Sequence, residues 1–400
     1  MVTSWSRRVM RYPVRMKSSA LVIGCATMAS GCARMSALDG DAGGGIGDAD
    51  TDTDTDTDTD TDPGDDVECN DEGWTLETIQ DGKVGERHSI AVATDGTPTV
   101  AFQNGGIIYA RRDSGTWTSE TVDAEYGWAN GRSGLSLALR TDGSPVVVWL
   151  RETDGKSTAL AHAVGSAEGW AVFRHGDELT ATDSMHAVDA EGSLRAIFAD
   201  EQLGTMHCNN VLDPDGGTMH FSPITTERAT GVAIALDSVG LAHASFRLDY
   251  GLVVYASARA GGDARVPEWT TESVGAGDSI GTSIAVDALD VAHVAYKYEG
   301  DVIHATDESG AWVPEIVAEG PVRSTNVALA LGADGEPNIA YLGTGELRLV
   351  TRSGGAWSDE PIAAASTPGR VALVIDAADG AHLSFVDSSG LRYAKACLRE

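Results

Sequence analysis

The sequence predicts an all-β protein, a seven-bladed β-propeller built from four-stranded antiparallel blades. Three observations indicate this fold. The 400-residue chain has 47 glycines, and its 9 tryptophans outnumber its 6 phenylalanines, which suits short strands and tight turns rather than helices. Residues 69–400 repeat one unit of about 43–53 residues, the length of a propeller blade. The strand that the last unit lacks stands in front of the first unit.

Each unit contains four short strands. In the clearest copy the first strand starts at Ser283, the second ends at Tyr296, the third starts at Val302 and the fourth at Trp312. The related units start near these residues: Ser89, Leu135, Met185, Val232, Val327 and Val371. Apolar and polar residues alternate within the units and glycines mark their turns, which predicts antiparallel pairing. A four-stranded sheet has two apolar faces, and radial packing of several sheets around an axis covers both.

The ends of the repeat region predict how the ring closes. The seventh unit stops at Glu400 after three strands, without its Trp strand. Residues 74–79 precede the first unit and match the Trp strand at 117–122. We therefore expect the N-terminal strand to pair within the last blade and to close the ring.

Two cysteines support this closure. Aligned on the first unit, Cys69 and Cys397 fall in the connection between the third and fourth strands, where the chain is interrupted. We expect a Cys69–Cys397 disulfide, because such bonds persist in exported proteins. In the chain-entropy model a bond that closes so long a loop contributes about 4–5 kcal/mol. Cys208 has no evident partner, and we expect it to be a small buried residue.

The N-terminus is expected to be an export signal. Basic residues up to Lys17 precede an uncharged, mostly apolar run over 18–31, which is too short to span a bilayer but fits a signal peptide. Residues 29–32, Ala-Ser-Gly-Cys, resemble a bacterial lipobox. The resemblance implies that residues 1–31 are removed and that Cys32 is lipidated, so that a lipid anchor makes the membrane a partner. Lipidation at Cys25 and an ordinary cleaved secretory signal are the alternatives.

Residues 32–68 predict a disordered tether. Between 33 and 68 there are thirteen acidic residues and one Arg, including six unbroken Thr-Asp pairs over 51–62. No apolar periodicity offsets the entropy cost of ordering this segment, and its like charges extend it. Such tethers resemble those on lipoproteins of myxobacteria and their relatives. Ala33, in place of Asp, implies by resemblance to Gram-negative lipoproteins an outer-membrane location, facing the periplasm or the cell surface.

The charge of the chain excludes one class of partner. The formal net charge is −32, of which −25 falls on the predicted propeller, residues 69–400. Such a surface repels the phosphates of nucleic acids, so we expect no nucleic-acid partner. We expect the propeller to be a monomer.

The repeats resemble the Asp-box or sialidase-like group of bacterial propellers. The Asp-box turn, Ser-x-Asp-x-Gly-x-x-Trp, is approximated by residues 113–117 and 307–312. The resemblance covers 69–400 and is generic, so it implies the fold and says little about activity.

The ten histidines do not predict a metal site. One group occupies the start of the second strand of its unit, and another the third strand: His243, His293 and His382, then His162, His207 and His304. Residues at the same place in different blades are a whole blade apart and cannot share one ion unless they line the axis. No His-Glu-x-x-His or paired-Cys motif is present, so we expect structural histidines and no bound metal.

Arginines recur in the loops that lead from one unit into the next. In a propeller these loops gather at one mouth of the central channel, with the loops between second and third strands. The arginines are Arg87, Arg132, Arg228, Arg323 and Arg370. Gathered guanidinium groups can bind a carboxylate or sulfate bidentately. Tyr126 and Trp128 stand in the same class of loop, where aromatic rings can stack on sugars. Independent surface arginines and an ordinary loop anchor are the alternatives.

No catalytic constellation is evident in the sequence, and we expect no cofactor. The predicted function is a non-enzymatic binding module that recognises a glycan or a protein at the channel mouth. A glycan-cleaving enzyme of sialidase or lyase type and an envelope scaffold are the alternatives, because the fold does not choose among them. An enzyme needs an acidic residue beside the arginines, and four are suitably placed: Glu86, Asp183, Glu227 and Asp278. A scaffold needs a contiguous apolar patch on the rim.

Overall fold

A computed structural model describes the protein over residues 69–124, 133–152, 157–210, 218–259, 265–278, 281–365 and 369–397. These residues belong to one compact unit, Pro63–Glu400. The signal peptide at 1–31, Cys32 and the tether at 32–68 lie outside the described residues and stay predictions. Within the described ranges, no helix has the length and apolar character needed to cross a membrane.

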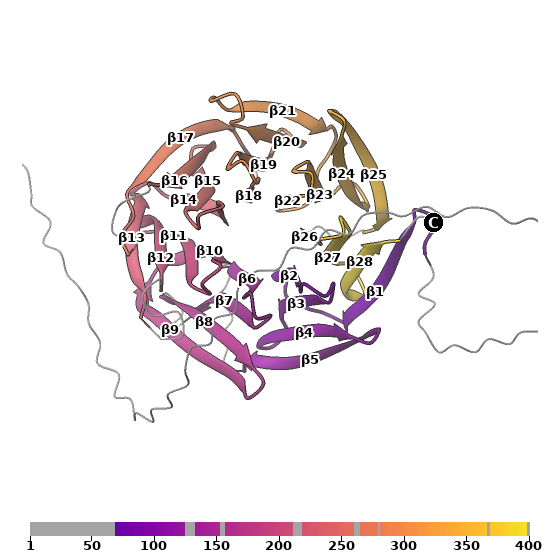
Figure 1. Ribbon diagram of the computed structural model, residues 1–400, viewed down its shortest axis with the longest axis horizontal. Helices are drawn as coiled ribbons and strands as arrows, with labels where there is room; N and C mark the ends of the chain where they lie inside the picture. Colours follow the sequence, from indigo (N-terminus) through magenta and orange to yellow (C-terminus); the bar gives the residue numbers. More distant parts are fainter. Residues whose placement is uncertain are drawn as a thin grey trace, which may run out of the picture. The chain divides into compact units, whose positions relative to one another are not determined.

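The described ranges fold into strands β1 to β28, which occupy four positions in their sheets (Figure 1). The innermost strands are β2 (His88–Val92), β6 (Ser133–Leu139), β10 (Ala181–Val188), β14 (Ala229–Leu236), β18 (Ser283–Val286), β22 (Ala328–Leu331) and β26 (Val371–Ile375). The second strands are β3 (Pro98–Gln103), β7 (Pro145–Glu152), β11 (Leu194–Asp200), β15 (Ala242–Leu248), β19 (Ala292–Tyr298), β23 (Pro337–Leu342) and β27 (Ala381–Val386). The third strands are β4 (Ile107–Asp113), β8 (Thr158–Ser166), β12 (Gly204–Asn209), β16 (Leu252–Ala258), β20 (Asp301–Thr306), β24 (Glu346–Ser353) and β28 (Gly390–Ala396). The outermost strands are β5 (Thr116–Asp123), β9 (Gly169–Leu179), β13 (His220–Thr225), β17 (Trp269–Ala276), β21 (Val313–Ala318), β25 (Ala356–Ala364) and β1 (Trp74–Asp81).

The strands form five four-stranded sheets and one eight-stranded sheet, arranged in a ring (Figure 1). In the eight-stranded sheet, β6 and β10 pair in parallel through Gly134 and Ser184. A Cβ atom on Gly134 would lie 2.7 Å from the backbone nitrogen of Ser184, so only glycine allows this close approach.

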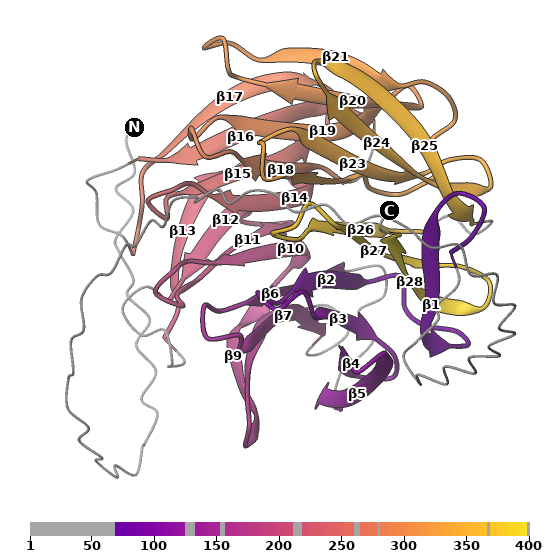
Figure 2. The same ribbon diagram turned by 45° about the vertical axis from the view of Figure 1, so that its right-hand side comes forward.

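The N-terminal strand pairs where the sequence predicts. β1 lies antiparallel to β28, with Trp74 opposite Ala396, in the sheet that also holds β27 and β26 (Figure 2). β1 is thus the outermost strand of a sheet whose other members come from the end of the chain.

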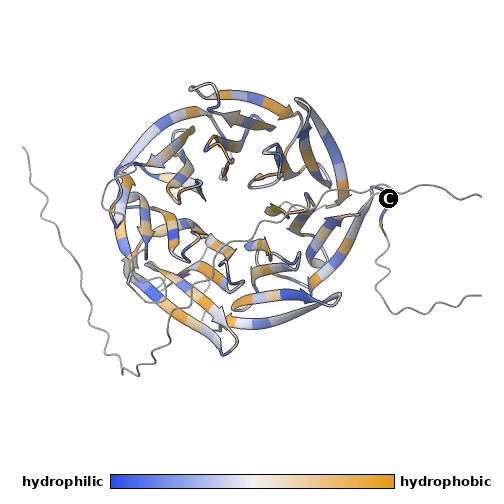
Figure 3. Cartoon of the chain, viewed as in Figure 1, coloured by the Kyte–Doolittle hydropathy of each residue, from blue (hydrophilic) through white to orange (hydrophobic). Residues whose placement is uncertain are grey.

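The hydrophobic core lies between neighbouring sheets. In one cluster, Val253 and Tyr255 of β16 pack with Val294 of β19 and Ile303 of β20. Second and third strands such as β3 and β7 are buried along most of their length, so each sheet presents side chains to both of its neighbours. The outermost strands carry a mixture of hydrophobic and hydrophilic residues (Figure 3). This packing is the burial of two faces that the repeats predict.

The tryptophan that recurs on the outermost strands packs against the third strand of the preceding sheet. Trp117 packs edge-on against Tyr393 of β28, with ring centroids 5.3 Å apart, and its indole nitrogen donates to Glu77 at 2.8 Å. The same contact joins these pairs: Tyr109–Trp170, His207–Trp269, Tyr255–Trp312 and His304–Trp357. Aromatic pairs of this geometry contribute about 0.5–1.5 kcal/mol beyond the area that they bury.

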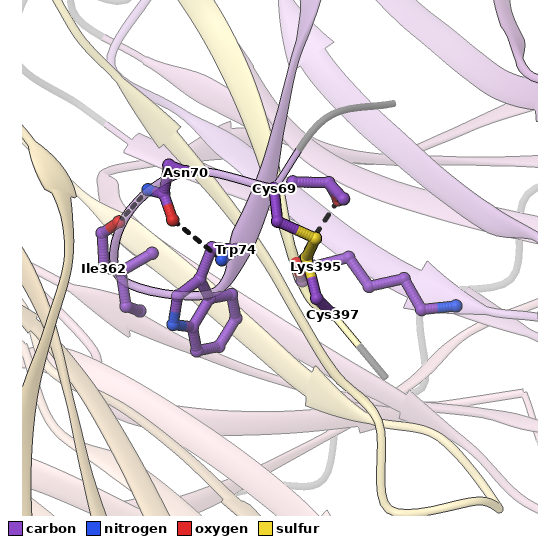
Figure 4. The surroundings of a disulfide bond; sticks show 7 residues. Cys69, Asn70, Trp74, Ile362, Lys395 and Cys397 are labelled. Carbon is purple, nitrogen blue, oxygen red and sulfur yellow. Dashed lines mark hydrogen bonds between the residues drawn. A yellow bond between two sulfur atoms is a disulfide. The ribbon is translucent and has the colours of Figure 1, made fainter. Parts of the chain in front are cut away.

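The predicted disulfide is present. Cys69 and Cys397 are bonded across a sequence separation of 328 residues (Figure 4). The amide nitrogen of Cys397 donates to Gly73, and the Asn70 side chain donates to the carbonyl of Ile362 at 2.8 Å. The start of the domain is therefore fastened to its end and to the neighbouring β25. Cys208 is a free, buried residue in the core, as the sequence predicts.

Candidate functional site

The two classes of loop that the sequence places at one mouth do meet. The connections into the innermost strands form backbone hydrogen bonds with the turns between second and third strands. The amide of Gln103 donates to Arg87, the amide of Asp249 donates to Arg228, and the amide of Arg323 donates to Leu342. We call this side of the ring the entry end.

Two of the predicted arginines converge on Asp183 at the entry end. The guanidinium of Arg370, before β26, lies 3.9 Å from the carboxylate of Asp183 on β10. Arg87, before β2, also acts electrostatically on this carboxylate. These three residues form what we call the Asp183 cluster. They come from three different sheets, so only the tertiary structure brings them together.

Burial dominates the chemistry of Asp183. The residue is 7% exposed, and burial raises the pKa of its carboxyl to about 6. The charge of Arg87 and hydrogen bonds from the amides of Ser184, Val232 and Gly231 oppose this rise. A carboxyl group with such a pKa can hold or release a proton near neutral pH.

A buried histidine places Arg370 relative to β2. The Nδ1 atom of His88 lies 2.8 Å from the hydroxyl of Ser384, and its Nε2 atom lies 3.2 Å from the carbonyl oxygen of Arg370. Burial, with the nearby charge of Arg87, lowers the pKa of His88 to about 4. His88 is therefore neutral at pH 7, and the positive charge of the cluster resides on its two arginines.

The other predicted site residues are placed differently. Arg228 and Arg323 are exposed on their loops and do not belong to the Asp183 cluster. Arg132, Tyr126 and Trp128 lie outside the described residues.

Asp183 also has a structural role, because polar side chains link neighbouring sheets around the inner ring. The amide of Leu137 donates to Ser89, Ser136 bonds to His186, and the hydroxyl of Thr282 donates to Gly231. Further around, the amide of Leu329 donates to Ser283, and Asn326 exchanges two hydrogen bonds with Val371.

Asp183 performs the same linkage between β10 and β14. Among the four acids that the sequence makes eligible, it is the one that the fold places beside the arginines.

The sequence-based prediction does not include two exposed tyrosines at or beside the turns between second and third strands. Tyr250 is 66% exposed and Tyr298 38% exposed, on adjacent sheets at the entry end. The pKa of Tyr250 is raised by desolvation and by the nearby charge of Glu227, and the pKa of Tyr298 is raised by the neighbouring Glu299. Tyr298 corresponds in register to Leu248, and Tyr250 lies in a turn that is one residue longer, so alignment of the units carries no signal for this pair.

The repeated histidines take part in contacts within and between sheets. His382 bonds to Asp376 at 2.9 Å and to the hydroxyl of Tyr393 at 2.6 Å, and His243 bonds to Tyr255 in the same way. These contacts agree with the structural role that the repeat predicts. Over the described ranges, no group of three His, Cys, Asp or Glu side chains converges to hold a metal ion.

No family model and no curated protein matches the sequence. Solved structures are similar. Virginiamycin B lyase from Staphylococcus aureus is 13% identical, with a TM-score of 0.54 over 82% of this chain and 100% of that one. AofleA from Arthrobotrys oligospora is 14% identical, with a TM-score of 0.50 over 74% and 90%. A fungal fucose-recognising lectin from Aleuria aurantia, described as a six-bladed β-propeller, is 16% identical with a TM-score of 0.48 over 70% and 96%.

The ring of antiparallel sheets defines the class of protein. The chain is an all-β protein with a β-propeller fold. At these low identities the similarity concerns the fold alone, and function has to be argued from the residues of the site.

Proposed function

We propose that the protein is a lipid-anchored binding module that recognises a glycan or a protein ligand at the entry end of a seven-bladed propeller. The single observation that carries the binding proposal is the convergence of Arg87 and Arg370 on Asp183. Guanidinium groups bind carboxylate or sulfate groups bidentately, so an anionic group of a ligand suits this cluster. The exposed Arg228 and Arg323 add positive charge at the same end of an otherwise acidic domain.

The blade count belongs to the same proposal. The eight-stranded sheet divides at the β6–β10 pairing into two runs of four strands, which with the five four-stranded sheets makes seven blades. The pairing of β1 with β28 and the Cys69–Cys397 bond support a ring closed by the N-terminal strand.

The cellular setting is proposed from the sequence. Export through residues 1–31, lipidation of Cys32 and the acidic tether at 32–68 place a monomeric domain away from the outer membrane, in the periplasm or on the cell surface. The negative charge of the domain disfavours a nucleic-acid ligand.

A glycan array tests the binding proposal. The oxidised full chain in detergent is compared with a variant in which Arg87, Arg228, Arg323 and Arg370 are changed to Ala. Arg111→Ala is the matched control, because Arg111 is exposed on β4 and pairs with Asp113. We expect binding to acidic sugars that the fourfold variant loses and the control keeps. An absence of binding by the folded protein would remove the glycan hypothesis and favour a protein ligand.

The Asp183 cluster also favours a second candidate function, glycan cleavage. Asp183 combines a raised pKa with two neighbouring arginines, as a general acid beside a bound carboxylate does. Incubation of the array ligands with the wild type and with Asp183→Asn tests this function by product analysis. Products formed by the wild type and not by Asp183→Asn establish an enzyme, and intact ligands with both leave the binding module.

The scaffold alternative has narrower support. Val239 and Leu289 are 76% and 83% exposed, on turns joined by a hydrogen bond from the Ser238 amide to Asp290. This apolar pair is small compared with the patches of a few hundred Å² that mark stable protein contacts.

A further inference from the structure

A pocket at the entry end is separate from the Asp183 cluster. It has a volume of about 170 Å³ and lies on the sheet that contains β14 to β17. Its floor is apolar and is formed by Phe246, Leu248, Leu252 and Val254. These side chains belong to the cluster that packs against Ile197 of the neighbouring sheet, so the pocket opens beside the junction of the two sheets.

The rim of the pocket is rich in hydroxyl groups. Thr225 and Glu227 contribute from the connection between β13 and β14, and Tyr250 from the turn between β15 and β16. Thr271 and Ser273 contribute from β17, where both are exposed. An apolar floor with a few convergent polar groups is the usual construction of a small-molecule site.

The charge of the lining residues restricts the ligand. The residues that line the pocket include glutamates and neither lysine nor arginine. Glu227 and Tyr250 both line the pocket, and the carboxylate of Glu227 has lone pairs that can accept hydrogen bonds from hydroxyl groups. A carboxylate repels anions, so an acidic sugar or a phosphate does not suit this pocket.

The volume of the pocket also restricts the size of the ligand. Pockets for drug-sized molecules measure about 300–1,000 Å³, so about 170 Å³ corresponds to a single small ring. A sugar ring has an apolar face of C–H groups and an edge of hydroxyls, which match the floor and the rim. The exposed ring of Tyr250 provides a stacking surface at the opening.

We propose that this pocket is a second binding site, which takes one neutral sugar ring. Tyr250 stacks on the C–H face of the ring, and Glu227, Thr225, Thr271 and Ser273 bond to its hydroxyls. The site goes beyond the function proposed above, because it shares no residue with the Asp183 cluster and selects a neutral ligand rather than an anionic one.

The next sheet provides a matched control. Tyr298 is the last residue of β19, beside the turn between β19 and β20, and is also exposed. It does not line the pocket. Tyr298→Ala therefore removes another exposed tyrosine at the entry end and leaves the pocket complete.

The test is titration of the full chain in detergent with methyl glycosides of neutral hexoses and 6-deoxyhexoses, followed by ligand-observed NMR. Wild type, Tyr250→Ala, Glu227→Gln, Tyr298→Ala and Arg370→Ala are compared, and thermal unfolding verifies that each is folded. We expect saturable binding of at least one neutral glycoside, weakened about tenfold or more by Tyr250→Ala. Glu227→Gln should weaken it less, and Tyr298→Ala and Arg370→Ala should leave it unchanged.

Three results would overturn the proposal. The first is no saturable binding of any neutral glycoside to the wild type. The second is equal loss with Tyr250→Ala and Tyr298→Ala, which indicates nonspecific stacking. The third is loss with Arg370→Ala and not with Tyr250→Ala, which locates the sugar at the Asp183 cluster. Neutral binding that survives Arg370→Ala while acidic glycans fail to bind would support this site and contradict the function proposed above.

Discussion

Asp183 shows how one side chain can serve both the architecture and a site. Its carboxylate receives amide hydrogen bonds from β14 and faces two arginines from other sheets. The cost of burial exceeds the stabilisation by these partners, so the pKa lies above its ordinary value of 3.8. The ionised form is therefore held at the expense of stability, which is a common property of functional sites.

The pH dependence of stability tests this account. Between pH 4 and 6 the folded state keeps the Asp183 proton that the unfolded state releases, so this group stabilises the fold most below pH 3.8 and progressively less as the pH rises through about 6. Asp183→Asn stays neutral and removes this contribution. We expect the stability of the variant relative to the wild type to increase by about 1–3 kcal/mol from pH 4 to pH 7. Urea unfolding at pH 4, 5, 6 and 7 measures it, and a constant difference would contradict the account.

At the scale of elements, two contacts hold neighbouring sheets together at opposite edges of the sheets. The recurring tryptophan packs on the outer strands, and polar links such as Ser89 to Leu137 join the innermost ones. The sheets are consequently fastened at both edges, with the apolar cores between them.

Trp117 tests the outer contact. Trp117→Ala removes the packing against Tyr393 and the hydrogen bond to Glu77. We expect a loss of about 2–4 kcal/mol in the free energy of unfolding, as for other large-to-small changes of an aromatic residue. Ser119→Ala, on an exposed position of the same strand, should change it by less than about 0.5 kcal/mol. Chemical unfolding measures both, and equal effects would show that the tryptophan contact is not specific.

Gly134 tests the pairing of the innermost strands β6 and β10. A methyl group at this position meets the backbone of Ser184, so Gly134→Ala forces β6 and β10 apart. We expect a destabilisation of about 1–3 kcal/mol. Gly369→Ala is the control, since the nearest atom to its added methyl group lies 4.0 Å away. A melting temperature of Gly134→Ala equal to that of the control would show that the two strands can separate without cost.

For the whole molecule, the two ends of the described chain meet in one sheet, where a disulfide joins them. Pairing of β1 with β28 supplies backbone hydrogen bonds, and the disulfide restricts the unfolded chain. Both features act on the same sheet.

The disulfide is tested by reduction. Replacing Cys69 and Cys397 with Ser should lower the free energy of unfolding by about 2–5 kcal/mol. A reductant should destabilise the wild type and Cys208→Ala, and should not affect the double variant. Denaturant unfolding with and without the reductant makes this comparison. A reductant effect that persists in the double variant would mean that another group is responsible.

The sequence by itself determined the local and repetitive features of this protein. Strand periodicity recurs along the units, and the glycine turns and tryptophans recur in most of them, so one well-formed copy identifies the others. The orphan strand at Trp74 and the pair Cys69 and Cys397 indicated where the ends meet, because each matched a gap in the repeat. These inferences need only the alignment of the chain with itself.

Only the tertiary structure decided which polar residues come together. Asp183, Arg87 and Arg370 each precede the first-strand residue that faces the aromatic of the second strand, so alignment of the units gives them one repeat position. The alignment does not show that these three, from units far apart in the chain, converge on one another. The pocket beside Tyr250 likewise depends on how one sheet packs against the next. The physical reason is that strand formation depends on short-range periodicity, whereas burial and charge at a site depend on three-dimensional distances that the ring closure sets.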